Sequence, residues 1–207
     1  MVEISEPIKL PTEFGNVLIR HFSFSDSEGS RIDGDRRVKE GVVVAKSLEP
    51  PTPTVVRLQS SCLFGEAFWA TDCDCGRQLH FGSQEVIRRD GILVYLYEEG
   101  RGAGLKRKVQ AISLQQRMGI ETDQAFECLA LESDLRSYKA ASEVLKRIFG
   151  ARPEVILLTN NPAKRVGLEQ NGIRIAATEP HIPLNLTDAM KRYLIKKRER
   201  LGHDIPF

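Results

Sequence analysis

The first third of the chain contains short apolar runs that are rich in β-branched side chains. Three such runs cover residues 16–22, 41–45 and 54–58. Because β-branched residues pack well on a pleated surface, each run predicts a strand. The polar, glycine-containing stretch over residues 25–37 separates the first two runs and predicts an exposed loop.

From residue 76 onward, apolar residues recur at helical spacing in some segments and run continuously in others. Helical spacing, with glycine stops at Gly119 and Gly150, predicts helices over about residues 76–90, 105–118, 135–149, 162–172 and 188–201. Continuous runs predict strands over residues 92–97, 155–161 and 172–178. This alternation predicts an α+β (mixed α/β) fold in a single domain over residues 1–207, in which residues 188–207 form a basic C-terminal helix and tail.

Composition adds few constraints, because the chain resembles an ordinary globular protein. Hydrophobic residues make up 41% of the 207 residues, and the formal net charge is +2. No apolar stretch approaches the roughly 20 residues that a membrane span needs. The start, MVEISEPIKLP, lacks the basic and apolar order of a signal peptide. We therefore expect a cytoplasmic protein with no membrane partner and no nucleic-acid partner.

The basic residues are unevenly placed along the chain. One cluster comprises Lys106, Arg107 and Lys108, and a second extends from Lys191 to Arg200. The glycines beside the first cluster favour an anion site, because they allow backbone N–H groups to approach the anion. For the second cluster, a solvated helix face is the more common explanation.

Three of the four cysteines are close together in sequence, in the pattern Cys62-x10-Cys73-x-Cys75. In a reducing compartment, such a trio predicts a metal site rather than disulfides. Three thiolates bound to zinc at about 2.3 Å leave a fourth position for water, as in catalytic sites. Spacing alone leaves open three unrelated buried cysteines, or a closed four-thiolate site completed by Cys128. Otherwise Cys128 is expected to be a buried small residue.

Two turns that follow predicted strands carry groups suited to phosphate. In EGRGAG, residues 99–104, the glycines expose backbone N–H groups and Arg101 can add a bidentate contact. In TNNPAK, residues 159–164, Thr159 offers a hydroxyl and Lys164 a charge. An ordinary tight turn explains EGRGAG equally well, and TNNPAK is a weak signal alone because Asn-Asn-Pro is an ordinary helix cap. For the Asp134-x-Arg136 pair, an ion pair or a helix cap is the usual explanation.

Taken together, these features resemble the GTP cyclohydrolase II family, which opens the imidazole ring of guanine. The resemblance covers nearly the whole chain and rests on CLFGEAFWATDCDCG, EEGRGAGL, D-L-R and LLTNNPAK, in the family's order and separations. It implies that Cys62, Cys73 and Cys75 bind one Zn²⁺, whose bound water attacks C8 of the purine. Formate and pyrophosphate are then released, with Mg²⁺ accompanying the phosphates, and the protein is a homodimer.

The resemblance also assigns roles to individual residues. It gives the catalytic roles to Arg136, the family's proposed nucleophile at the α-phosphorus, and to Asp134 beside it. Because a guanidinium stays protonated in nearly all proteins, the presence of Arg136 at the site is the firmer part of that implication. Triphosphate contacts would fall to Arg57, Arg101, Thr159 and Lys164. The remaining substrate-binding positions are Ser61, Gln78, Glu99, Gly100, Ile112 and Thr122.

The sequence departs from the family's pattern on the side expected to bind the base. Ser61 replaces a glutamate, Glu98 replaces a glutamine, and Ile112 replaces an active-site tyrosine. Losing hydrogen-bonding groups at such a site changes the accepted ligand strongly. Three readings follow: a cyclohydrolase that acts on GTP, one that acts on a pyrimidine nucleotide such as a uridine phosphate or stops at the formamide intermediate, and a non-catalytic nucleotide-binding homologue.

Overall fold

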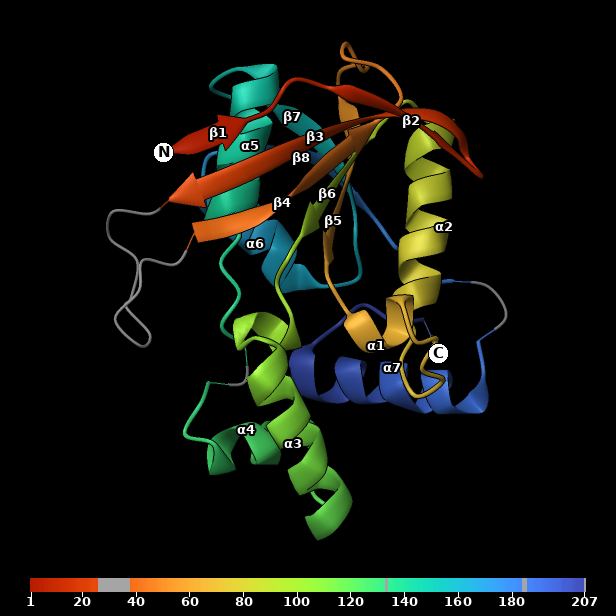
Figure 1. The fold of residues 1–207 in the computed structure, drawn as a ribbon, viewed down its shortest axis with the longest axis vertical. Coiled ribbons are helices and arrows are strands. Elements are labelled where there is room, and N and C mark those ends of the chain that lie inside the picture. Colours follow the sequence, from red (N-terminus) through yellow and green to blue (C-terminus); the bar gives the residue numbers. More distant parts are fainter. Residues whose placement is uncertain (26–37, 133, 184–185, 207) are drawn as a thin grey trace.

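The computed structural model describes residues 1–25, 38–132, 134–183 and 186–206. Of the loop expected over residues 25–37, Ser25 is the last residue of a strand and the rest lies outside the described residues. The described chain forms a mixed β-sheet with helices packed around it, which is the expected α+β class (Figure 1). The strands are β1 (Val2–Ile4), β2 (Ile8–Thr12), β3 (Gly15–Ser25), β4 (Val38–Ala45), β5 (Thr54–Ser60), β6 (Ile92–Leu96), β7 (Glu154–Leu158) and β8 (Arg174–Glu179). The helices are α1 (Leu63–Glu66), α2 (Cys75–Arg88), α3 (Leu105–Met118), α4 (Thr122–Cys128), α5 (Lys139–Phe149), α6 (Pro162–Gln170) and α7 (Asp188–Leu201), with a 3₁₀ turn, η1, at Gly100–Gly102.

The sheet has the strand order β1-β3-β4-β6-β5-β7-β8, and β2 pairs with β3 beside this path. Strands β1 to β4 pair antiparallel, as do β4 and β6, whereas β6, β5, β7 and β8 run parallel. Val56, Leu58 and Val94, in the central strands β5 and β6, are fully buried. Strands covered on both faces need continuous apolar runs, which explains the sequence pattern of this half of the sheet.

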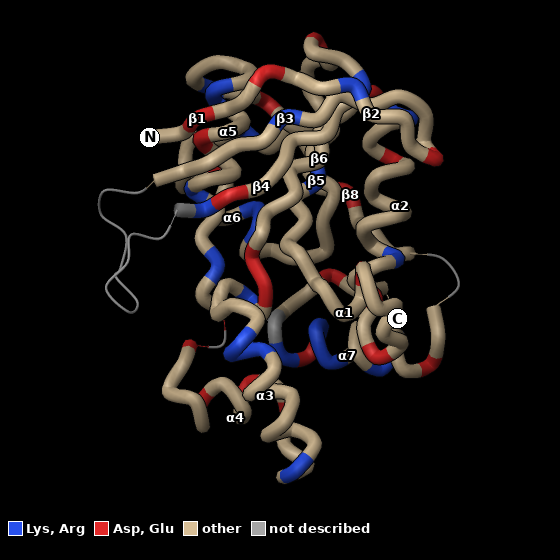
Figure 2. The backbone as a smooth tube through the Cα atoms, viewed as in Figure 1, with Lys and Arg blue, Asp and Glu red and all other residues tan. Residues whose placement is uncertain are grey.

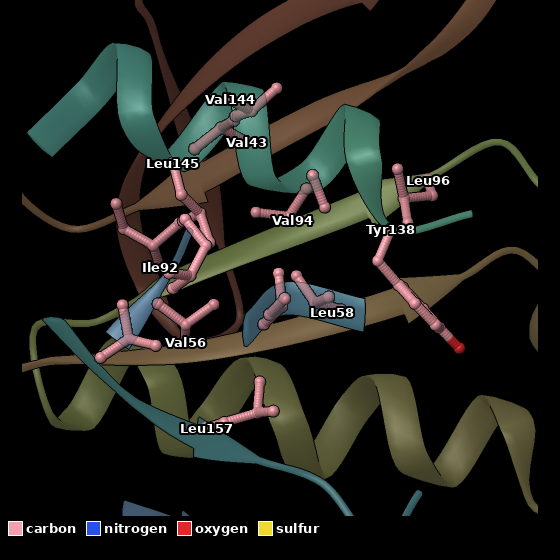
Figure 3. Packing of buried hydrophobic residues seen from close by; sticks show 14 of the residues in the cluster. Val43, Val56, Leu58, Ile92, Val94, Leu96, Tyr138, Val144, Leu145 and Leu157 are labelled. Carbon is pink, nitrogen blue, oxygen red and sulfur yellow. The ribbon is translucent and has the colours of Figure 1, made fainter. Parts of the chain in front are cut away.

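Helices cover both faces of the parallel half. On one face, Val144 and Leu145 of α5 pack in a cluster that includes Val94 of β6 (Figure 3). On the other face, Val86 of α2 packs against Leu93. Full burial of such a side chain contributes about 1.5–3 kcal/mol, so these layers hold the sheet rigidly. In the described residues, no helix has both the length and the apolar character that crossing a membrane requires.

The helix expected over residues 135–149 begins only at Lys139, so the prediction was wrong at its start. The Leu135 N–H donates to the Arg101 carbonyl at 2.9 Å, and the Arg136 N–H donates to the Asp134 carboxylate at 3.0 Å. These contacts fix a turn against η1, and tertiary packing overrides the helical spacing of the sequence.

The expectation that Cys128 is buried was also wrong, because it lies exposed at the end of α4. Helix α4 has seven residues and a capping box between Glu121 and Gln124. A helix of two turns is too short for apolar periodicity to reveal it. It packs with α3 in a separate small cluster around Ala111 and Phe126.

Candidate active site

The carboxyl ends of β5, β6 and β7 lead directly into the residues singled out from the sequence. Cys62 follows β5, Arg101 follows β6 and Thr159 follows β7. Parallel sheets usually place ligands beyond these strand ends, and a cavity of about 350 Å³ lies there. Of the predicted site residues, Asp134 and Glu99 do not line the cavity but contact residues that do, namely Arg136 and Lys108. The others line it, namely Arg57, Ser61, Cys62, Cys73, Cys75, Gln78, Gly100, Arg101, Ile112, Thr122, Arg136, Thr159 and Lys164.

The three clustered cysteines converge as the sequence predicts. Their sulfur atoms all lie within 4.8 Å of one another, and the Cys62 and Cys73 sulfurs are 4.0 Å apart. Thiolates on a tetrahedral zinc ion are separated by roughly 3.8 Å, so the trio fits that metal. A Cβ added at Gly76 would lie 2.2 Å from the Gly65 carbonyl oxygen, so glycine is needed for the two cysteine-bearing segments to meet. The four-thiolate alternative is wrong, since Cys128 is exposed on α4.

Hydrogen bonds among the three thiols, with a smaller effect of the Lys108 charge, favour a thiolate at Cys62. Hydrogen bonds from the Cys73 and Cys75 thiols hold the pKa of Cys62 far below its ordinary value, although burial opposes the shift. The same interaction raises the pKa of Cys73 to about 11, because one negative charge hinders a second. Lys108 lies 3.3 Å from the Cys62 sulfur and 2.7 Å from the Glu99 carboxylate. Of the basic cluster at residues 106–108, only Lys108 is therefore at the site; its two neighbours are exposed.

Among the described residues, two buried cations at the cavity wall make hydrogen bonds only to neutral acceptors. Arg57, 2% exposed, donates to the Leu158 carbonyl at 3.2 Å and to the Gln78 side chain at 3.1 Å. Lys164, 8% exposed, donates to the Leu58 carbonyl at 2.7 Å. Burial lowers the pKa of Arg57 to about 10. Burial, then the charges of Arg57 and nearby cations, lowers the pKa of Lys164 well below its usual value. Unbalanced buried charge of this kind fits an anionic ligand.

A third cation at the cavity, Arg136, forms an ion pair with the carboxylate of Asp134. Its Nε donates to the two oxygens of Asp134 at 2.8 and 3.1 Å, which fixes the guanidinium plane. Burial lowers the pKa of Arg136, but the Asp134 hydrogen bond and charge outweigh it and raise the value above the ordinary one. The guanidinium therefore stays protonated.

The Asp134–Arg136 segment packs tightly on the glycine-rich turn that follows β6. Arg101 has a left-handed φ of 56°, and Gly102 has a φ of +85°. A Cβ at Gly102 would lie 3.0 Å from the Leu135 carbonyl. Gly102→Ala should therefore destabilise the protein by about 1–3 kcal/mol through backbone strain and displace Arg136. Chemical denaturation and activity assays check this; Gly104→Ala is a matched control, because Gly104 also has a positive φ but open space at the Cβ position.

The three departures on the expected base side are placed at the cavity. Ser61 and Ile112 line it, so an apolar side chain stands where the resemblance implies a phenol. Nearby, the Thr122 hydroxyl donates to Gln115 at 3.1 Å. Glu98 is 8% exposed and accepts from Lys39 at 2.5 Å, which explains how a carboxylate is tolerated there. Its second oxygen has no hydrogen-bond partner in the described chain.

Sequence reasoning missed residues that follow the last strand. His181, Tyr193, Lys197 and His203 all line the cavity. Burial lowers the pKa of His181 to about 3 and that of His203 to about 4, so both are neutral at pH 7. A signal for Lys197 was present, since it lies seven residues after the buried Met190 and thus on the same face of α7. The expectation that the second basic cluster forms only a solvated face was wrong at this residue.

Comparisons with known proteins agree with this geometry. The sequence model of a family described as GTP cyclohydrolase II matches residues 3–180. The chain is 37% identical to riboflavin biosynthesis protein RibBA of Phocaeicola vulgatus, over all of this chain and 48% of that protein. It is 36% identical to RibBA of Bacillus subtilis, over all of this chain and 49% of that protein. It is 35% identical to GTP cyclohydrolase-2 of Helicobacter acinonychis, over 98% of this chain and 97% of that protein.

The chain thus spans about half the length of the two RibBA proteins and nearly all of the Helicobacter protein. The matched segment contains the cysteine trio, the turns at residues 99–104 and 159–164, and the Asp134–Arg136 pair. On the strength of this match over most of its length, the chain belongs to the GTP cyclohydrolase II family.

Proposed function

We propose that the protein is a zinc-dependent cyclohydrolase that opens the base ring of a nucleotide, with GTP as the first candidate substrate. One observation carries the proposal. A single cavity is lined both by the three convergent thiols and by the buried cations Arg57 and Lys164. A nucleotide carries both features that such a cavity selects, namely a polyphosphate and a ring that water can attack.

The phosphate side relies on residues of three strand ends. Arg57 and Lys164 supply charge that burial leaves unscreened, and Arg101 lies on the turn after β6. Thr159, 3% exposed, sits at the end of β7 and can donate its hydroxyl. A Mg²⁺ ion would travel with the phosphates, since this ion is commonly bound by phosphate oxygens and water.

The metal side rests on Cys62, Cys73 and Cys75. These three thiolates would hold a zinc ion, which would supply a nucleophile by lowering the pKa of bound water toward neutrality. Glu99 orients this wall without lining the cavity, because it accepts from both Lys108 and the backbone N–H of Leu63.

Arg136 acts in this proposal as a fixed cation at the α-phosphate. Its raised pKa and its paired contacts with Asp134 keep it protonated, so it lacks the lone pair that a nucleophile needs. Asp134 aligns the guanidinium, and together they stabilise negative charge that develops during pyrophosphate departure.

A second candidate is favoured by Ser61 and Ile112, which line the cavity where the resemblance implies a glutamate and a tyrosine. Neither residue can replace the lost carboxylate, and isoleucine has no hydrogen-bonding group. A cyclohydrolase that accepts a pyrimidine nucleotide such as a uridine phosphate, or that stops at the formamide intermediate, fits these residues.

A nucleotide panel decides between the candidates. Purified protein is incubated with GTP, ATP, UTP, UMP and their diphosphates, and ring opening and formate release are measured. Full turnover of GTP to the deformylated product supports the first candidate. Turnover of uridine phosphates, or of GTP to the formamide alone, supports the second. Binding of several nucleotides without any reaction, in protein that carries about one zinc per chain, would leave only the non-catalytic homologue.

The remaining predictions concern assembly and surroundings. We propose a homodimer, which sedimentation equilibrium of the purified chain checks directly. A single folding unit over residues 1–207, a cytoplasmic location and the lack of a nucleic-acid partner remain predictions from the sequence.

A further inference from the structure

Helix α7 lies beyond the segment that the family model matches, yet it forms part of the cavity wall. The match ends at residue 180, and α7 begins at Asp188. The helix lies across the end of the sheet where β5 and β6 stop, beside α1 and α3, and carries several basic residues (Figures 1 and 2). Tyr193 and Lys197 from this helix line the cavity, as do Leu194 and Lys196.

One ion pair joins α7 to the segment Cys73–Cys75, called the cysteine loop below. Lys197 Nζ donates to Asp74 Oδ1 at 3.1 Å. Asp74 has no exposed surface, and the Lys197 side chain is 14% exposed. Asp74 is the residue between Cys73 and Cys75, so this buried ion pair reaches the loop at its centre.

The ion pair continues into the phosphate side of the cavity through one amide. Gln78 donates from Nε2 to the second oxygen of Asp74, and its Oε1 accepts from Arg57 at 3.1 Å. The amide is thus oriented from both ends. A single chain of hydrogen bonds links α7, the cysteine loop and the phosphate-binding wall.

Charge balance explains why a lysine is needed at this position. A zinc ion bound by three thiolates carries one net negative charge, and buried Asp74 adds another. Lys108, 3.3 Å from the Cys62 sulfur, is shared with the Glu99 carboxylate at 2.7 Å, so Lys197 is the cation that pairs with Asp74. Without Lys197, the Asp74 carboxylate would be buried beside the thiolates with, among the described residues, only an amide donor from Gln78.

The same helix is fixed to α4 on both sides of Thr122. Lys196 pairs with Glu121 at 2.8 Å, and Arg200 pairs with Asp123 at 2.6 Å. Thr122 of α4 lines the cavity, and so do Cys73 and Cys75 of the cysteine loop. Because α7 contacts both segments, it positions them relative to each other.

We infer that Lys197 is a positioning residue for the proposed reaction, which acts through Asp74 to hold the Cys73–Cys75 loop and Gln78 in place. This inference rests on the proposed function: its zinc-affinity measurement rests on the metal site alone, and its activity measurement rests also on the reaction. Lys197→Met removes the charge and keeps the length of the side chain. Outer contacts of this kind typically set metal affinity or activity by about 10–100-fold.

The experiment compares Lys197→Met, Lys197→Arg, Asp74→Asn and the double variant Asp74→Asn/Lys197→Met. Lys191→Met is the control. Lys191 lies on the same helix but is 53% exposed, and its ion pair with Asp188 is long, at 4.0 Å. Zinc affinity is measured by competition with a chromogenic chelator, and kcat and KM with the best nucleotide. Thermal melting verifies that each variant is folded.

We expect Lys197→Met to weaken zinc binding or lower kcat by about 10–100-fold with a smaller change in KM, and Lys197→Arg to recover most of the loss. The double variant should be no worse than the worse single variant, because both act on one interaction. The double variant removes both charges of the pair and leaves neither one buried alone. It therefore tests the inference even if Lys197→Met does not fold.

Zinc affinity and kcat within about twofold of Lys191→Met would overturn the inference. A rise in KM alone would also overturn it, since Lys197 would then contact the nucleotide itself. If the wild-type protein bound zinc but transformed no nucleotide, the proposed function would be wrong. The comparison of zinc affinities would still test whether Lys197 positions the cysteine loop.

Discussion

Cys73→Ser is expected to reduce the zinc content of the purified protein from about one ion per chain to a small fraction and to lower kcat by at least about 10³-fold. Serine stays protonated near neutral pH and is a poor zinc ligand, so two thiolates remain where three converge within 4.8 Å. The fold should persist, because the core formed by β5, β6 and α5 does not involve the cysteine loop. Metal analysis, a thermal melt and a steady-state assay on the same sample measure the three effects.

Cys128→Ser is the matched control for this experiment. Cys128 is an exposed free thiol at the end of α4, away from the sulfur cluster. Its replacement should leave zinc content and kcat unchanged, which separates loss of the site from a general effect of losing a thiol. Unchanged zinc content in Cys73→Ser would show that the metal binds elsewhere, and the assignment of the trio would be wrong.

The centre of the fold follows from local sequence patterns. A run rich in β-branched residues predicts β5, continuous apolar runs predict β6 and β7, and helical spacing with a glycine stop predicts α3 with the bounds that the structure has. The three strands are buried as their patterns indicate, whereas α3 buries Ala111 and leaves Leu105, Val109 and Met118 exposed. The start of α5 could not be predicted in this way, because contacts from Leu135 to the η1 turn hold the preceding residues out of the helix.

The parts of the site that the sequence predicted are those carried by compact motifs. Cys62 and the two turns lie within a few residues of the carboxyl ends of β5, β6 and β7, so their meeting follows from a parallel sheet. Cys73, Cys75 and the Asp134–Arg136 pair lie farther along the chain, and their motifs rather than a strand end pointed to them. Lys197 carries no such motif. Its spacing from Met190 places it on the buried face of α7, but its partner cannot be read from that spacing. The contact with Asp74 joins residues 123 positions apart and depends on how α7 packs against the rest of the protein.

Lys164→Gln provides the second strong test, because it separates binding from folding. The amide keeps a donor for the Leu58 carbonyl, which now accepts from Lys164 at 2.7 Å, while the charge is removed. Losing one charge-assisted phosphate contact costs about 1.5–3 kcal/mol, so KM should rise about 10–100-fold with a smaller change in kcat. Steady-state kinetics measures both constants. Thr159→Ala, which removes a neutral donor from the same wall, should raise KM less.

The same substitution should leave the nucleotide-free protein as stable as the wild type or more stable. The folded-state pKa of Lys164 lies well below its unfolded value, because burial and neighbouring cations disfavour the charge. Between those two values the unfolded chain binds more protons, so wild-type stability rises with pH through this window. The wild type therefore carries a cost for burying Lys164 at every pH below the unfolded-state value, and Lys164→Gln does not. The stability difference between the two proteins should therefore be largest near pH 7 and shrink as pH approaches about 10.4, the pKa of an exposed lysine. Urea denaturation across that range measures it, and a difference that grows with pH would mean that Lys164 has an anionic partner in the free protein.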